Sequence, residues 1–92
     1  MESGRETFIH VLDGEVLNIE VSYVVEDEDS RPTIHWQARV STESQWLDVS
    51  LTGTLPFNLG AFSDAGALAA IAARRALAHR LDHVRQALKA VH

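Results

Sequence analysis

Two histidines one helical turn apart are the first candidates for chemistry in this sequence. His79 and His83 have the i, i+4 spacing that brings two imidazoles onto one metal ion, and Asp82 lies between them. The pattern has no evident third ligand, and it lacks the glutamate of the zinc-protease motif. Arg75 and Arg80 would also repel a cation. The sequence therefore predicts a solvated polar helix face here, with no bound metal.

Arginines near the end of the chain form a second candidate, a surface for anions. All acidic residues except Asp82 lie before residue 65, so the last segment is basic although the net charge is −5. Charge alone can bind phosphates, and this segment could contact nucleic acid. Basic residues also complement the dipole at a helix C-terminus, which requires no partner. The candidate anion contacts are Arg74, Arg75, Arg80 and Arg85.

The sequence shows no residues at catalytic spacing. Without cysteine, thiol nucleophiles, thiolate metal sites and disulfides are excluded. His10 is predicted on the buried side of a strand, across from Leu17. His35 is predicted to point outward beside Thr52, with no acid nearby. The acidic run 26–29 lacks the glycine and the terminal glutamate of a calcium loop. We therefore expect no catalytic activity and no cofactor, and we expect the acidic run to be a solvated loop.

A first β-hairpin is predicted from the alternating segment 7–26. Its alternation is interrupted by Asp13 and Gly14, a dipeptide that tolerates the positive φ angles of a two-residue turn. This turn fixes the register, so that Val11 faces Val16. One side of the hairpin is then apolar, and the residues on it are Phe8, Leu17, Ile19, Val21, Tyr23 and Val25.

A second hairpin is predicted from two alternating segments that flank the polar run 42–45. Only one parity puts the apolar residues of both strands on the same side. The opposite side then pairs Arg39 with Asp48. The predicted inner pairs are Val40 with Leu47, Ala38 with Val49, Trp36 with Leu51 and Ile34 with Gly53. An acidic segment that contains proline joins the two hairpins.

The last third of the chain predicts one long helix. Ser63 or Asp64 can cap its start, and neither proline nor glycine interrupts it after Gly66. Apolar residues three or four apart form one stripe, which comprises Ala70, Ala73, Leu77, Leu81, Val84, Leu88 and Val91. The distal half of the stripe matches heptad positions, so it could pack on the sheet or dimerise with another helix. The sequence leaves both possibilities open.

Apolar residues also fall on the sheet face that the helix does not cover, called the outer face below. Several apolar residues of the first hairpin alternate with its core residues, so they point to the outer face. Trp46 is predicted opposite Ser41 on that same face. Contiguous exposed apolar surface usually marks an interface. The candidate interface residues, on the outer face and on the helix, are Ile9, Val11, Val16, Trp46, Leu81 and Leu88.

Together these patterns predict a single α+β domain over residues 1–92. Its fold is a four-stranded antiparallel β-meander in the order 1-2-3-4, with one long C-terminal helix packed on one face. The expected strands are 6–13, 15–26, 33–42 and 46–55, and the expected helix is 64–91.

The composition, 46% hydrophobic and 23% charged, is typical of a globular domain. No segment has the roughly 20 apolar residues that span a bilayer, and the polar N-terminus does not resemble a signal peptide, so we expect a cytoplasmic protein. The first hypothesis is a small non-catalytic protein-interaction or regulatory domain that forms a homodimer through the helix or the outer face. The alternative is a nucleic-acid-binding accessory protein that uses the basic helix.

Overall fold

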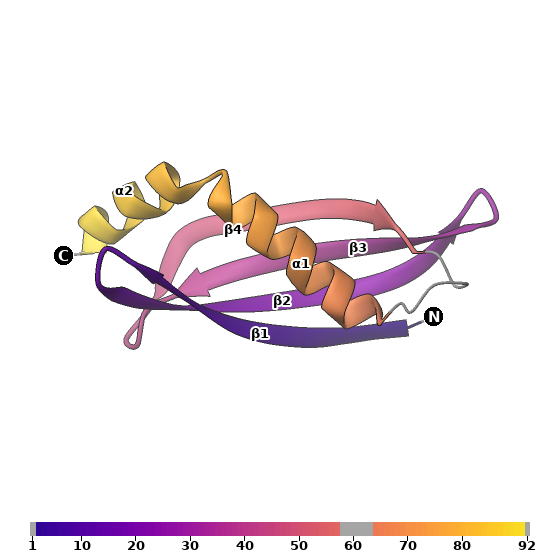
Figure 1. Cartoon of the computed structure of the whole chain (residues 1–92), viewed down its shortest axis with the longest axis horizontal. Coiled ribbons are helices and arrows are strands. Elements are labelled where there is room, and N and C mark those ends of the chain that lie inside the picture. The colour runs from indigo at the N-terminus through magenta and orange to yellow at the C-terminus, as the bar shows by residue number, and fades with distance from the viewer. Residues whose placement is uncertain (1, 58–63, 92) are drawn as a thin grey trace.

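The fold is a four-stranded antiparallel meander with helices on one face. The computed structural model describes residues 2–57 and 64–91. The sheet order is β1-β2-β3-β4, and the strands are β1 (Glu2–Leu12), β2 (Glu15–Glu28), β3 (Arg31–Ser41) and β4 (Trp46–Pro56). Two helices, α1 (Ala65–Ala78) and α2 (Leu81–Val91), lie over the sheet (Figure 1). The predicted fold class and strand order are confirmed.

The first hairpin has the predicted register. Asp13 and Gly14 form its turn with φ angles of 51° and 82°, the positive values that the dipeptide indicated. Val11 faces Val16, and His10 faces Leu17. The turn sequence alone was sufficient to align these two strands, because a two-residue turn allows only one pairing of the residues that flank it.

The second hairpin differs from the prediction in register but not in which side faces the core. Ser41 faces Trp46 as predicted, but the sheet has a β-bulge between Arg39 and Ser41. From Arg39 back to the start of β3, each residue therefore faces the β4 residue two positions further along the chain than predicted. Trp36 therefore faces Gly53. The predicted pairs Ala38 with Val49, Trp36 with Leu51 and Ile34 with Gly53 are wrong. Strand side chains alternate with period two, so a shift of two leaves the same residues on the buried side.

The acidic run is part of a hairpin, and the prediction of a long acidic loop is wrong. β2 continues to Glu28 and β3 begins at Arg31, which leaves a two-residue turn. Asp29 and Ser30 form this turn with φ angles of 52° and 64°. Positive φ is unusual for residues other than glycine, although aspartate tolerates it better than most. No Asn-Gly or Asp-Gly signal announces this turn, and that is why the sequence indicated a loop.

The predicted single helix is divided in two. The backbone N–H of His79 is shared between the carbonyls of Arg75 and Ala76, at 3.3 and 3.2 Å. The N–H of Arg80 reaches back three residues to the carbonyl of Leu77, at 2.9 Å. This tightened last turn ends α1, and α2 starts when the N–H of Val84 bonds to the Arg80 carbonyl at 3.0 Å. Asp64, one of the two predicted candidates, is the N-cap of α1.

The break follows from the shape of the sheet. α1 contacts all four strands, whereas α2 contacts β4. A straight helix of this total length would extend about 40 Å in one direction, while neighbouring strands rotate by about 20°. Redirecting the chain at His79 lets Val84 and Leu88 reach the twisted sheet and become buried. Helical periodicity in the sequence carries no information on this twist.

The core lies between the helices and the inner sheet face. Small side chains line the start of α1, where Ala65, Ala69 and Ala73 are almost fully buried. The buried stripe includes Ala69 rather than the predicted Ala70, which is half-buried. Alanines on this side let the helix backbone approach the sheet closely. Within the described part of the chain, no helix combines the length and the apolar character needed to cross a membrane.

Candidate functional site

The outer face carries apolar side chains at one end. Ile9 and Val11 of β1, Val16 of β2 and Trp46 of β4 are all exposed, as predicted, with exposed fractions from 41% to 63%. Val11 and Val16 are direct cross-strand neighbours. Ile9 and Trp46 lie at opposite edges of one cross-strand row, joined through Asn18 and Ser41. We call Ile9, Val11, Val16 and Trp46 the outer patch.

Arg39 covers part of this surface instead of forming the predicted ion pair. Its guanidinium carbon lies 3.8 Å from the centre of the Trp46 ring, a cation–π contact. The bulge places Ser50 opposite Arg39, so the predicted pair of Arg39 with Asp48 is wrong. Glu20 of β2 is the other cross-strand neighbour of Arg39. The row next to the outer patch therefore has a carboxylate and a guanidinium on the two central strands.

Beyond this charged row, the middle of the outer face has an open hollow of about 480 Å³. No residue of the helices lines it, so it opens on the side of the sheet opposite α1. The side chains that point into it come from three strands, and they are Ser22, Val24, His35, Gln37, Thr52 and Thr54. Five of these six side chains carry polar groups, and Val24 is the apolar one.

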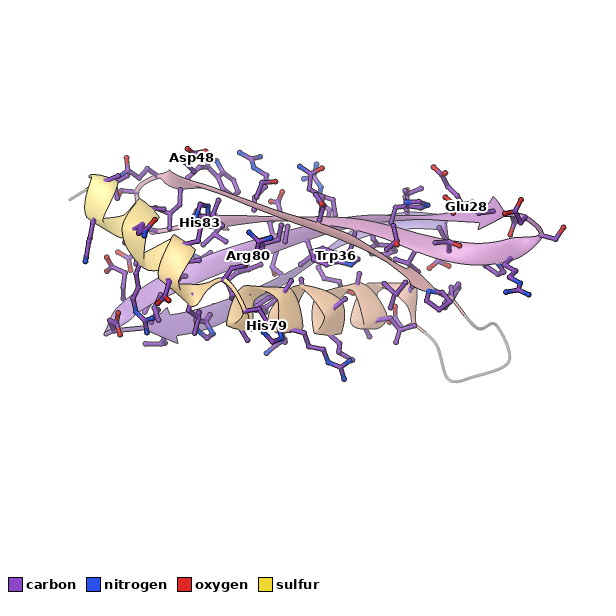
Figure 2. All side chains as sticks on the ribbon, turned by 90° about the horizontal axis from the view of Figure 1, so that it is seen from above. Glu28, Trp36, Asp48, His79, Arg80 and His83 are labelled. Carbon is purple, nitrogen blue, oxygen red and sulfur yellow. The ribbon has the colours of Figure 1, made fainter. Side chains whose placement is uncertain are left out.

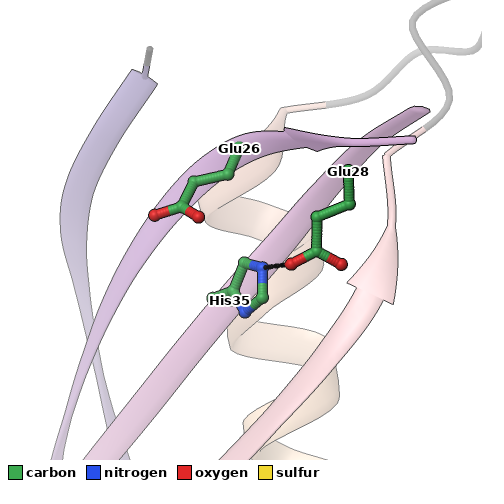
Figure 3. A group of neighbouring side chains, drawn as sticks. All are labelled: Glu26, Glu28 and His35. Carbon is green, nitrogen blue, oxygen red and sulfur yellow. Dashed lines mark ion pairs between the residues drawn. The ribbon is translucent and has the colours of Figure 1, made fainter. Parts of the chain in front are cut away.

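A cluster that the sequence did not predict lies beside the hollow, near the β2–β3 turn. His35 of β3 points toward Glu26 and Glu28 of β2, and the three offer ligand atoms within 4.8 Å of one another (Figure 3). Nε2 of His35 is 2.7 Å from Oε1 of Glu28, close enough for an ion pair. This nitrogen is nevertheless shielded from solvent, and its contact does not have the geometry of a hydrogen bond. We call these three residues the Glu-His cluster.

The prediction that His35 has no acid nearby was wrong because the acidic run was taken as a loop. In an extended strand, Glu26 and Glu28 share one side, and pairing with β3 puts that side beside His35. The cross-strand partner of His35 is Thr54, not Thr52. The alternation of Glu26 and Glu28 was the available signal, but it could not be used without knowing that β2 continues.

The candidate residues on the helices are placed differently from those on the outer face. Leu88 is buried and Leu81 is half-buried, and both pack in the intramolecular core. The distal helix stripe therefore packs on its own sheet. His79 and His83 lie on either side of the helix break (Figure 2), so they no longer have the regular i, i+4 spacing that would bring two imidazoles together.

Two of the four candidate anion contacts interact with other residues of the same chain. Arg74 lies over the Phe8 ring, with its guanidinium carbon 4.4 Å from the ring centre. Arg85 donates to Asp13 at 2.8 Å and to Asp82 at 3.0 Å. The hydrogen bond and the charge of Asp13 raise the pKa of Arg85. Arg74, Arg75 and Arg80 are all exposed, whereas Arg85 is half-buried. Part of the positive charge is thus directed to the acidic sheet of the same molecule.

Besides Arg85, Tyr23 is the residue in the described part of the chain whose pKa is shifted from its ordinary value. Its side chain lies at the rim of the core, against Gly4 of β1. Desolvation is the main cause that raises the pKa of Tyr23, and the negative charges of Glu2, Asp64 and Glu6 raise it further. The raised pKa therefore reflects the packing of the ring and the negative charge around it.

Comparisons with known proteins give no family. No protein-family model, no curated protein and no solved structure matches this chain. The function must therefore be argued from the geometry of the outer face.

Proposed function

We propose that this chain is a non-catalytic interaction domain that forms a homodimer through its outer face. The proposed dimer has a two-fold axis parallel to the strands, between β2 and β3. Such an axis places β1 of one copy over β4 of the other, and β2 over β3. The two copies contribute the same surface, as a two-fold interface requires.

The observation that carries this proposal is the self-complementary order of side chains across the sheet. Ile9 and Trp46 end the same cross-strand row at opposite edges. The two-fold axis puts each of them over the other in the partner copy, which removes both from water. In the next row, Glu20 and Arg39 occupy the central strands. The same axis puts Glu20 of one copy over Arg39 of the other, so that apolar and charged rows are matched together.

The size of the outer face is adequate for a reversible dimer. Four strands spaced about 4.8 Å apart, each about ten residues long, present a surface of roughly 600 Å² per copy. A face-to-face dimer would then bury about 1,200 Å² in total, the lower limit of specific interfaces. Stacked sheets in proteins cross at about 30°, so the central strands, which carry Glu20 and Arg39, keep the closest alignment.

The first experiment compares oligomeric state in variants with matched exposure. Trp46→Ala and Ile9→Glu should each shift the mass measured by light scattering from dimer to monomer. Ile71→Glu is the control, because Ile71 on α1 is exposed to the same 47% as Trp46 but lies away from the outer face. A monomeric wild-type chain at high concentration contradicts the proposal, as does a dimer that Ile71→Glu disrupts and Trp46→Ala does not.

A charge exchange tests the proposed axis itself. Glu20→Arg and Arg39→Glu should each weaken the homodimer, because the facing charges then have the same sign. Mixing the two variants should restore a dimer that contains one copy of each, since both facing pairs are again opposite in charge. A pair within one copy cannot produce this rescue. Absence of the mixed dimer, while each variant remains folded by circular dichroism, would exclude this axis.

The alternative, binding to nucleic acid through the basic helix, is tested in the same measurement. Light scattering across a salt series, with and without a short DNA duplex, separates the two functions. Phosphate binding weakens steeply as salt rises, whereas apolar contacts do not. A dimer that persists in salt and ignores DNA supports the outer-face interface. A complex with DNA that dissociates at high salt, and that Arg75→Ala and Arg80→Ala weaken, supports the alternative instead.

A further inference from the structure

Beyond self-association, we propose that the Glu-His cluster is a binding site for a divalent transition-metal ion of the zinc class. The three ligands would be the carboxylates of Glu26 and Glu28 and the imidazole Nε2 of His35. They come from two neighbouring strands and converge on one side of the sheet (Figure 3). This site is separate from the outer patch, which lies at the other end of the outer face.

The positions of the three ligand atoms are close to what one ion needs. Ligands that bind at about 2.1 Å lie at most about 4.2 Å apart around the same ion, and about 3.4 Å apart in a tetrahedral arrangement. The cluster holds its ligand atoms within 4.8 Å of one another, with Nε2 and Oε1 of Glu28 at 2.7 Å. Both glutamates are exposed, so small rotations of their side chains can supply the remaining adjustment.

The state of Nε2 is the second observation that indicates a ligand. A simple ion pair between His35 and Glu28 would align the ring N–H with the carboxylate, but this contact lacks hydrogen-bond geometry. The nitrogen is shielded from solvent, so water does not replace that bond. A single ion pair also gives no role to the second carboxylate, that of Glu26. A metal between the three groups would satisfy the nitrogen and both carboxylates.

The donor set and the surrounding charge favour a cation of this class. An imidazole nitrogen with carboxylate oxygens suits zinc and similar divalent ions, whereas magnesium and calcium prefer oxygen ligands alone. Asp27 and Asp29 add negative charge to the same hairpin end. Arg31, across from Glu28, is the one basic residue of this turn and its flanking positions. The end of the hairpin therefore keeps an excess of negative charge that a divalent ion would neutralise.

The test is a titration of the untagged chain of residues 1–92 with Zn²⁺ by calorimetry, and with Co²⁺ by visible absorption. We expect one ion per chain. His35→Ala, Glu26→Gln and Glu28→Gln should each weaken binding at least about tenfold, the loss typical when a metal site is disturbed. Matched controls on exposed residues elsewhere are His79→Ala and Glu43→Gln, which should bind as the wild type does. Circular dichroism shows that each variant is folded.

Several results would overturn the metal site. One is the absence of saturable binding to the wild type, and another is equal loss of binding in His35→Ala and in His79→Ala. Retention of full affinity in both glutamate variants would leave an ion pair only, without a metal site. Repeating the titration on Trp46→Ala separates this site from the proposed dimer. If this monomeric variant binds the metal with unchanged affinity, metal binding does not depend on self-association.

Discussion

The two faces of the sheet are built by the same four strands, yet they differ sharply in what they bury. On the inner face, α1 and α2 cover the alternating apolar residues, and no buried polar or charged residue occurs in the described part of the chain. On the outer face, no described element covers the sheet, and its large exposed apolar residues are those of the outer patch. The comparison shows that alternation alone divides a strand into two sides, but that a covering element decides which side becomes core.

The two tryptophans give the most direct test of this difference, because each face has one. Trp36 points to the helix side of the sheet and is 6% exposed, whereas Trp46 is 47% exposed (Figure 2 labels Trp36). Trp36→Ala should lower the free energy of unfolding by about 3 to 5 kcal/mol, since it leaves a cavity in the core. Trp46→Ala should lower it by less than about 1 kcal/mol. Denaturant unfolding at concentrations where the chain is monomeric measures both.

Equal losses for Trp36→Ala and Trp46→Ala would break the comparison of the two faces. They would mean that the outer face contributes to monomer stability as much as the core does.

Gly53 sharpens the comparison within one strand. A Cβ at this position would lie 2.7 Å from the Trp36 ring, far inside van der Waals contact. Gly53→Ala should therefore cost about 1 to 3 kcal/mol, the usual penalty for overpacking. The neighbouring Thr52 points to the outer face, so Thr52→Ala should cost less than about 1 kcal/mol. If Gly53→Ala is as mild as Thr52→Ala, the ring of Trp36 does not pack on β4 as described.

Tyr23 provides the smallest expected effect, a dependence on alkaline pH. It is the only tyrosine in the chain, so its ionisation can be followed by ultraviolet absorption without interference from another phenol. Its pKa is raised in the folded state, chiefly by desolvation. The folded chain thus favours the neutral phenol. Ionisation of Tyr23 should leave the free energy of unfolding unchanged below about pH 10, its ordinary pKa. Above that pH the unfolded chain loses the phenol proton more readily than the folded chain, so the free energy of unfolding should fall.

Two measurements check the tyrosine prediction. The titration midpoint of Tyr23 should be higher in the folded chain than in denaturant, and Tyr23→Phe should remove this contribution to the alkaline loss of stability. A midpoint equal in both states would mean that the rim of the inner face is as solvated as the outer face.

How much could be predicted from the sequence differs between the two hairpins. The Asp13-Gly14 turn defined the first register completely, and the outer patch residues of this hairpin were placed correctly. In the second hairpin, alternation put Trp36 and Trp46 on the correct sides but allowed a shift of two residues. The Glu-His cluster was missed because its carboxylates belong to a run whose composition suits a loop as well as a strand.

The sequence by itself determined the class of fold, the strand order, and which side of each strand is apolar. These features follow from local periodicity and turn chemistry, which each segment carries on its own. The bulge in β4, the break at His79 and the approach of Glu26 and Glu28 to His35 were decided only by the tertiary structure. Each depends on how the twisted sheet, its neighbouring strands and the covering helices fit together, and a repeat of period 2 or 3.6 in one segment contains no information about that fit.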